Sequence, residues 1–205
     1  KFYDCDILIN TTPVGMYPDT GVSPVDIEKF KKCTHVLDII YNPAKTKLQL
    51  DAEREGKITE NGMSMLVAQA KRGCEIFTKT EIDDGKIEEI KTKIEKMTKN
   101  IILIGMPGSG KTTIGKALSK KMGRDFKDTD EEISAMGRTP KEIIEARGEG
   151  AFRKTETEVL SKLSKESRLV ISTGGGIVTK DENLDLCRQN SVTVFIERDL
   201  EKLDV

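Results

Sequence analysis

The sequence contains no tryptophan, and aromatic residues make up only 4% of its 205 residues. This scarcity argues against a surface on which nucleic-acid bases stack. The charges also nearly cancel, with 34 basic and 35 acidic residues, so there is no excess of one sign to attract a polyanion or an anionic membrane. We therefore expect neither a nucleic-acid partner nor a membrane-surface partner.

Long apolar runs and metal-ligand clusters are missing as well. No run approaches the ~20 apolar residues that cross a bilayer, and no signal peptide is recognisable. The single histidine, His35, cannot form a metal cluster and is expected to be structural. The cysteines form no C-x-x-C pair, which favours buried, reduced thiols over zinc ligands or disulfides and predicts a cytoplasmic protein. They are Cys5, Cys33, Cys74 and Cys187.

A glycine-rich stretch in the middle of the chain carries the strongest signal. Residues 101–104, Ile-Ile-Leu-Ile, predict a buried parallel strand. Residues 105–112, Gly-Met-Pro-Gly-Ser-Gly-Lys-Thr, match the phosphate-binding pattern G-x-x-x-x-G-K-[ST]. The pattern then becomes helical, with one apolar face formed by Ile114, Ala117, Leu118 and Met122. A strand before and a helix after the motif favour phosphate binding over a chance match in a glycine-rich turn.

Each residue type in this stretch suits a nucleotide triphosphate. Glycines let backbone N–H groups approach phosphate oxygens closely, and the helix adds its positive N-terminal end. Lys111 is expected to reach the β- and γ-phosphates, and the Thr112 hydroxyl to ligate Mg²⁺. The predicted ATP-binding residues are Gly108, Ser109, Gly110, Lys111, Thr112 and Thr113.

Polar residues downstream suggest a second half of the same site. Asp128 and Asp130 are two apart at a predicted strand end, so on an extended backbone they face one way, towards Mg²⁺ and an acceptor alcohol. Alternatively, Asp130 is the N-cap of a helix over 131–136. Arg153 either pairs with Glu156 on a helix surface or binds a substrate carboxylate bidentately.

Four ordered blocks resemble the shikimate kinase family: residues 105–113, residues 126–130 (Phe-Lys-Asp-Thr-Asp), residues 148–156 (Gly-Glu-Gly-Ala-Phe-Arg-Lys-Thr-Glu) and residues 172–176 (Ser-Thr-Gly-Gly-Gly). The resemblance implies a phosphate-loop fold like that of nucleoside-monophosphate kinases. It also implies ATP-dependent phosphorylation of the shikimate 3-hydroxyl in aromatic amino acid biosynthesis.

The same resemblance assigns roles to individual residues. Lys111, Asp130 and Arg153 are implied to be catalytic, with Lys111 stabilising the transferring phosphoryl group and Asp130 orienting or deprotonating the hydroxyl. Asp130 and Arg153 are implied to hold shikimate in a pocket lined by Gly174, Gly175 and Gly176, while Thr112 and Asp128 lie near Mg²⁺. The family's lid is expected after Val205, so this unit is expected to be incomplete.

The first hundred residues predict a second α/β unit, with strands over 6–10 and 34–41. Residues 9–16, 37–46 and 61–70 resemble the C-terminal part of shikimate dehydrogenase. This implies that Tyr41 and Gln69 contact the hydroxylated cyclohexene acid, and that Ile39 and Gly62 lie beside the nicotinamide. Without the resemblance, Tyr41 and Gln69 are ordinary surface polar residues.

We expect these four residues to be vestigial. No G-x-G-x-x-G occurs in the 205 residues, and the family's catalytic Lys and Asp are expected to precede Lys1. NADP is therefore expected only for a complete parent dehydrogenase, and dehydrogenase activity is not expected from these residues.

The predicted organisation is thus two parallel-sheet α/β units, the first a partial Rossmann-like unit. The boundaries are 1–79 for the dehydrogenase-like part, 80–99 for an amphipathic helix or linker, and 100–205 for the kinase-like part. Two other functions remain open: a phosphate-loop kinase of another small molecule, such as a nucleotide or gluconate, and a non-catalytic nucleotide-binding module.

Overall fold

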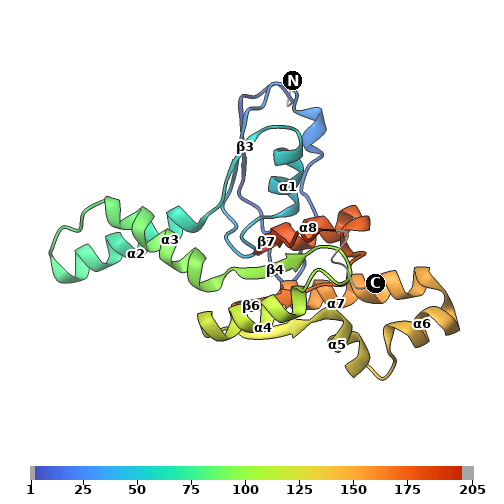
Figure 1. Cartoon of the computed structure of the whole chain (residues 1–205). Coiled ribbons are helices and arrows are strands. Elements are labelled where there is room, and N and C mark those ends of the chain that lie inside the picture. Colours follow the sequence, from blue (N-terminus) through green and yellow to red (C-terminus); the bar gives the residue numbers. More distant parts are fainter. Residues whose placement is uncertain (1–2, 200–205) are drawn as a thin grey trace. The chain divides into compact units, whose positions relative to one another are not determined.

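The computed structural model describes residues 3–199 and divides the chain into two compact units, one ending at Thr98 and the other beginning at Lys99 (Figure 1). Each unit is built on its own sheet, and every strand pair in both sheets is parallel. The predicted class, two parallel-sheet α/β units, is therefore confirmed.

The N-terminal unit has a three-stranded sheet in the order β1-β2-β3. Buried apolar side chains cluster between this sheet and α1; they are Ile27, Phe30, Cys33, Val36, Leu48 and Ala52. The elements are β1 (Ile7–Asn10), a 3-10 turn (Ile27–Lys29), β2 (His35–Asp38), α1 (Lys47–Arg54), β3 (Ile58–Glu60), α2 (Met63–Thr78) and α3 (Gly85–Thr98).

Strand β2 is shorter than the predicted 34–41, and Asp38 explains why. Its buried carboxylate accepts hydrogen bonds from the backbone N–H of Ile40 (3.0 Å) and from the Thr46 hydroxyl (2.7 Å). These bonds turn the chain out of the sheet after Asp38. Tyr41 consequently lies in the following loop and not on the strand.

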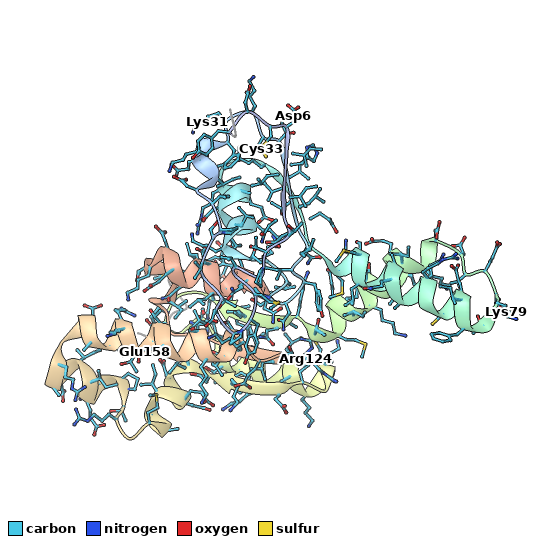
Figure 2. All side chains as sticks on the ribbon, turned by 180° about the vertical axis from the view of Figure 1, so that it is seen from behind. Asp6, Lys31, Cys33, Lys79, Arg124 and Glu158 are labelled. Atoms are coloured by element: carbon cyan, nitrogen blue, oxygen red, sulfur yellow. The ribbon has the colours of Figure 1, made fainter. Side chains whose placement is uncertain are left out.

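Helix α3 (Gly85–Thr98) forms within the charged segment 80–99 and packs against α2. Lys79, labelled in Figure 2, sits in the turn between them with a left-handed backbone conformation. None of the α3 residues is fully buried. The apolar stripe of this helix therefore covers α2 only partly.

The C-terminal unit has a four-stranded sheet in the order β5-β6-β4-β7. Its core is formed by residues of the central strands and of α7, among them Ile102, Ile171 and Leu160, all with no exposed surface. The elements are β4 (Asn100–Ile104), α4 (Lys111–Met122), β5 (Asp125–Asp128), α5 (Thr129–Ala135), α6 (Pro140–Arg147), α7 (Glu149–Ser164), β6 (Leu169–Ser172), a 3-10 turn (Ile177–Thr179), α8 (Asp181–Gln189) and β7 (Ser191–Phe195).

Helix α4 does not bury its apolar face. Ile114 and Met122 are exposed, whereas Lys111, Gly115 and Ser119 form the buried side. A Cβ atom on Gly115 would lie 2.5 Å from the Phe126 ring, so only glycine allows α4 to approach the sheet this closely. Close packing at a glycine thus overrides the hydrophobic periodicity.

The cysteine prediction holds for two of the four residues. Cys33 and Cys187 are buried, and burial raises the pKa of the Cys187 thiol to about 12. Cys5 is half-buried, and Cys74 is exposed on α2, which corrects the expectation of four buried thiols. Across residues 3–199, none of the helices is long and apolar enough to span a bilayer.

Candidate active site

The loop of residues 105–110 joins β4 to α4 in the conformation that the glycine pattern predicts. Gly108 and Gly110 have φ values of +74° and +90°, which favour glycine. The first intrahelical bond of α4 runs from the Ile114 N–H to the Gly110 carbonyl (2.9 Å), which leaves the amides of residues 111–113 without helical acceptors. The loop and helix start therefore offer a group of N–H donors suited to an anion.

Lys111 lies inside this loop. Its ammonium group donates to the Gly105 and Met106 carbonyls, both at 2.8 Å, and only 7% of the residue is exposed. Burial lowers the pKa of Lys111, while the negative charges of Asp128 and Asp130 oppose that shift. The positive charge is thus held by the loop and interacts electrostatically with both carboxylates.

Asp128 links the loop to the neighbouring strand. The Thr112 hydroxyl donates to Asp128 Oδ2 (2.8 Å), and Asp128 Oδ1 accepts from the Asp130 N–H (3.0 Å) as the N-cap of α5. The helix cap is therefore Asp128, and the alternative in which Asp130 caps this helix is wrong. Because Asp130 lies in the first turn of α5, the two carboxylates are also not related by an extended backbone.

The donor set formed by Thr112 and Asp128 fits Mg²⁺. A hydroxyl and a carboxylate oxygen are ligands of the type this ion prefers, and Mg²⁺ completes its shell with water and phosphate oxygens. The loop also contains a buried polar atom, Ser109 Oγ, that has no hydrogen-bond partner among the described residues. Both features suit a bound nucleotide and its metal ion.

Asp130 remains open to solvent beside this pair. Partial desolvation, followed by the charge of Asp128, raises the pKa of its carboxyl group, while Lys111 and Arg153 lower it. Although Asp130 does not lie on a strand, helix α5 therefore places its carboxyl group where the positive charges of Lys111 and Arg153 act on it. No described residue donates a hydrogen bond to the Asp130 carboxylate.

The Lys111→Ala variant is expected to raise the pKa of Asp130 further, because removing a nearby cation disfavours the ionised carboxylate. The measurement is a ¹³C NMR titration of the Asp130 carboxyl in both proteins, with Lys116→Ala as control for an exposed lysine on the same helix. An unchanged midpoint in Lys111→Ala would show that the ammonium is too distant to act on this carboxylate.

Arg153 is held by two carboxylates of unequal burial. On α7, its guanidinium donates to Glu156 Oε2 (2.9 Å) and to Glu149 Oε1 (3.0 Å). The Glu149 side chain is 70% exposed, but that of Glu156 is fully buried. The predicted Arg153–Glu156 pair therefore exists, although it is not the surface pair that helical spacing suggested.

Glu156 is the site residue that sequence reasoning missed. Burial raises the pKa of Glu156, Arg153 opposes that shift, and Oε1 has no hydrogen-bond partner among the described residues. Its i, i+3 spacing from Arg153 was the available signal, but spacing does not reveal burial. Glu156 is a buried partner that fixes the direction of the Arg153 side chain.

The triple glycine explains how these groups come together. A Cβ atom on Gly174 would lie 2.5 Å from Glu156 Oε1 and 3.4 Å from Asp130 Oδ1. A Cβ atom on Gly175 would lie 2.5 Å from Pro107 of the phosphate loop, and one on Gly176 would overlap the Arg153 guanidinium. The loop after β6 therefore contacts both halves of the site. At Gly175 the clash is with the rigid Pro107 ring, which favours glycine, whereas a Cβ atom at Gly174 or Gly176 would displace the Glu156 carboxylate or the Arg153 guanidinium.

The N-terminal unit brings three of its four predicted residues together. Ile39 and Tyr41 line a cavity of about 360 Å³, and a Cβ atom on Gly62 would collide with the Ile39 carbonyl. Gln69 is exposed on α2, and it is absent from the described residues that line this cavity. Ile39 and Tyr41 therefore line one cavity, and Gly62 packs against the backbone of Ile39.

Comparison with known proteins supports the resemblance of the C-terminal unit. The shikimate kinase family model matches residues 107–204. A shikimate kinase from Caldicellulosiruptor bescii is 48% identical over 99 residues, which is 48% of this chain and 58% of the relative. The structure of shikimate kinase from Acinetobacter baumannii in complex with shikimate has a TM-score of 0.51 at 38% identity, covering 55% of this chain and 63% of that one.

These matches identify the phosphate-loop kinase fold in the C-terminal unit, as the motifs predicted. The chain spans less than two thirds of the length of the relatives it matches. The structure of shikimate dehydrogenase 1 from Peptoclostridium difficile is 38% identical, with a TM-score of 0.42, and covers 44% of this chain and 34% of that one.

Proposed function

We propose that the C-terminal unit acts in a shikimate kinase, transferring the γ-phosphoryl group of ATP to the 3-hydroxyl of shikimate in aromatic amino acid biosynthesis. The observation that carries the proposal is the meeting of a phosphate-binding loop, Asp130 and Arg153 at one edge of the sheet. Phosphoryl transfer depends mainly on alignment and on neutralising spread negative charge. This edge supplies groups for both tasks.

The donor side of the reaction belongs to the loop and the start of α4. The amides of residues 108–113 hold the triphosphate, and Lys111 turns from the Gly105 and Met106 carbonyls to the β- and γ-phosphate oxygens. Thr112 and Asp128 would hold Mg²⁺ beside this loop. A bound Mg²⁺ supplies charge neutralisation at the oxygens that become more negative.

The acceptor side belongs to α5, α7 and the triple glycine. Arg153 binds the substrate carboxylate with its planar guanidinium. Asp130 accepts the proton of the attacking hydroxyl. The hydroxyl oxygen forms the new bond to the γ-phosphorus as the bond between this phosphorus and the leaving ADP oxygen breaks. Gly174 and Gly176 leave room for the Glu156 carboxylate and the Arg153 guanidinium, which face the acceptor, and Gly175 lets the loop approach Pro107. The similarity to a kinase solved with shikimate supports this choice of acceptor.

Two other functions are distinguished by a coupled ADP-release assay on the full-length protein with shikimate, gluconate and nucleoside monophosphates. Turnover with shikimate alone supports the proposal, and turnover with another acceptor supports a different small-molecule kinase. Binding of ATP without acceptor-dependent turnover supports a nucleotide-binding module. The proximity of Asp130 to Arg153 favours an acceptor that carries both a hydroxyl and a carboxylate.

The Glu156→Gln variant is expected to raise KM for shikimate about tenfold with a smaller change in kcat, because Arg153 loses its buried charged partner. Glu149→Gln is the matched control, since it removes the exposed partner of the same guanidinium and is expected to change KM less than about twofold. Steady-state kinetics with varied shikimate measures both. Equal effects of the two variants would contradict the assignment of Glu156.

For the N-terminal unit we propose a dehydrogenase-like remnant, in which Ile39, Tyr41, Gly62 and Gln69 correspond to NADP and substrate contacts of a complete dehydrogenase. The proposal rests on its three sequence blocks and the cavity beside Tyr41.

A cytoplasmic location is proposed because the reaction uses ATP and the four cysteines are free thiols.

A further inference from the structure

A groove on the C-terminal unit lies outside the site described above. It has a volume of about 490 Å³ and lies between α5, α6 and α7, which pack against one another (Figure 1). Part of its lining is apolar: Met136 is 66% exposed and Ile143 is 8% exposed, while Ile133 has no exposed surface. This volume is within the range of pockets that hold small organic molecules.

The groove uses a different face of α7 from the acceptor site. Ala151, Lys154, Thr155 and Glu158 line it, and their spacing of three and four residues places them on one side of the helix. Glu158 is labelled in Figure 2. Arg153 and Glu156 lie on the opposite side, because each is about half a helical turn away from that face. A molecule in the groove would therefore not occupy the acceptor pocket.

The charges around the groove are predominantly positive. Arg138, Arg147 and Lys154 line it, and among the described residues none of the three forms an ion pair with an acidic side chain. Glu158 is the acidic residue among the lining residues. Arg138 also interacts electrostatically with Glu142. Arg147 and Lys154 are therefore the main cations of the groove.

We propose that this groove binds a small organic dianion, a phosphate monoester or dicarboxylate with a compact apolar body. The cations pair with the charges of the ligand, and the exposed side chain of Met136 together with Ile143 contacts its apolar part. Guanidinium groups suit both anions, because their parallel N–H donors match carboxylate and phosphate oxygens. The site is independent of the proposed kinase reaction, and it contacts the two helices that carry Asp130 and Arg153.

The test is an NMR titration of the ¹⁵N-labelled full chain with phenyl phosphate and with phthalate. Saturable shifts are expected at the amides of Gly137, Ala151 and Thr155. Phenol and inorganic phosphate, which carry only the ring or only the charge, are expected to bind at least tenfold more weakly at these amides. Shifts confined to residues 108–113 would overturn the proposal, as would equally tight binding of phenol or inorganic phosphate.

Charge-removal variants make the test specific to the groove. The double variant Arg147→Gln/Lys154→Gln is expected to weaken binding at these amides at least tenfold. The control Lys141→Gln/Lys165→Gln removes the same charge from α6 and from the C-cap of α7, outside the groove, and is expected to stay within twofold. Equal weakening by both pairs would overturn the proposal. Should the first pair not fold, Arg138→Gln alone is expected to weaken binding severalfold, and unchanged binding would have the same consequence.

Discussion

The Lys111→Ala variant of the full-length protein is expected to lose phosphoryl transfer by about a thousandfold or more in kcat. Charge-stabilising groups of a transition state contribute about 10²–10³-fold each, and the lysine of a phosphate loop also positions the triphosphate. Lys111 is buried in the loop, so no solvent-exposed lysine can take its place. ADP release with saturating ATP and shikimate measures the loss.

Lys116→Ala is the matched control, since Lys116 lies on the same helix and pairs with Glu131 at the surface (3.3 Å). Its rate is expected to stay within twofold of the original. The Lys111→Ala variant should fold, because Lys111 donates only to loop carbonyls and its removal leaves α4 packed through Gly115. A folded Lys111→Ala protein with an unchanged rate would contradict the role of this lysine.

The phosphate loop was predictable because its geometry depends on residues adjacent in the chain. Gly108 and Gly110 adopt the left-handed conformations that glycine permits, and the strand and helix on either side follow from local hydrophobic patterns. The sheet edge was predictable for a different reason, since the carboxyl ends of parallel strands lie together. Local sequence is therefore sufficient for the donor half.

The acceptor half depends on contacts between segments far apart in the chain, which the sequence does not show. Glu156 is buried only because α7 packs against the loop after β6, where Gly174 leaves room for its carboxylate. The cap of α5 is a local contact, in which Asp128 Oδ1 accepts from the Asp130 N–H, but the sequence does not show which of the two aspartates makes it. The sequence shows which residue types are present, but it does not show whether Glu156 is buried or which aspartate caps α5.

The buried face of α4 shows a third limit. The apolar spacing of Ile114 and Met122 predicted one side, and the close approach allowed by Gly115 selected another. Periodicity predicts burial when side chains fill the space between elements. It does not when the backbone itself makes the contact.

Asp130→Asn is expected to lower kcat by about 10²–10⁴-fold, the range contributed by a positioned general base. Asparagine has the same shape, but it cannot accept the proton of the hydroxyl. The substitution should not destabilise the fold, because the side chain that caps α5 is Asp128 and only the backbone N–H of Asp130 takes part. Removing a carboxylate whose pKa is raised by desolvation and by Asp128 should leave Tm equal or higher above neutral pH, where Asp130 is ionised.

This pairing of lost activity with retained or increased Tm separates a chemical role from a structural one. Kinetics and thermal unfolding at the same pH measure the two quantities, and Asp125→Asn, on the preceding strand and exposed, is the control for loss of one negative charge. A fall in Tm with a proportional loss of folded protein would make Asp130 structural. A rate within tenfold of the original would exclude it as the base.

The raised pKa of Asp130 also predicts the pH dependence of the original protein. When kcat is measured against pH, the midpoint of its fall on the acid side should lie above the ordinary aspartate value of 3.8, because protonated Asp130 cannot accept the hydroxyl proton.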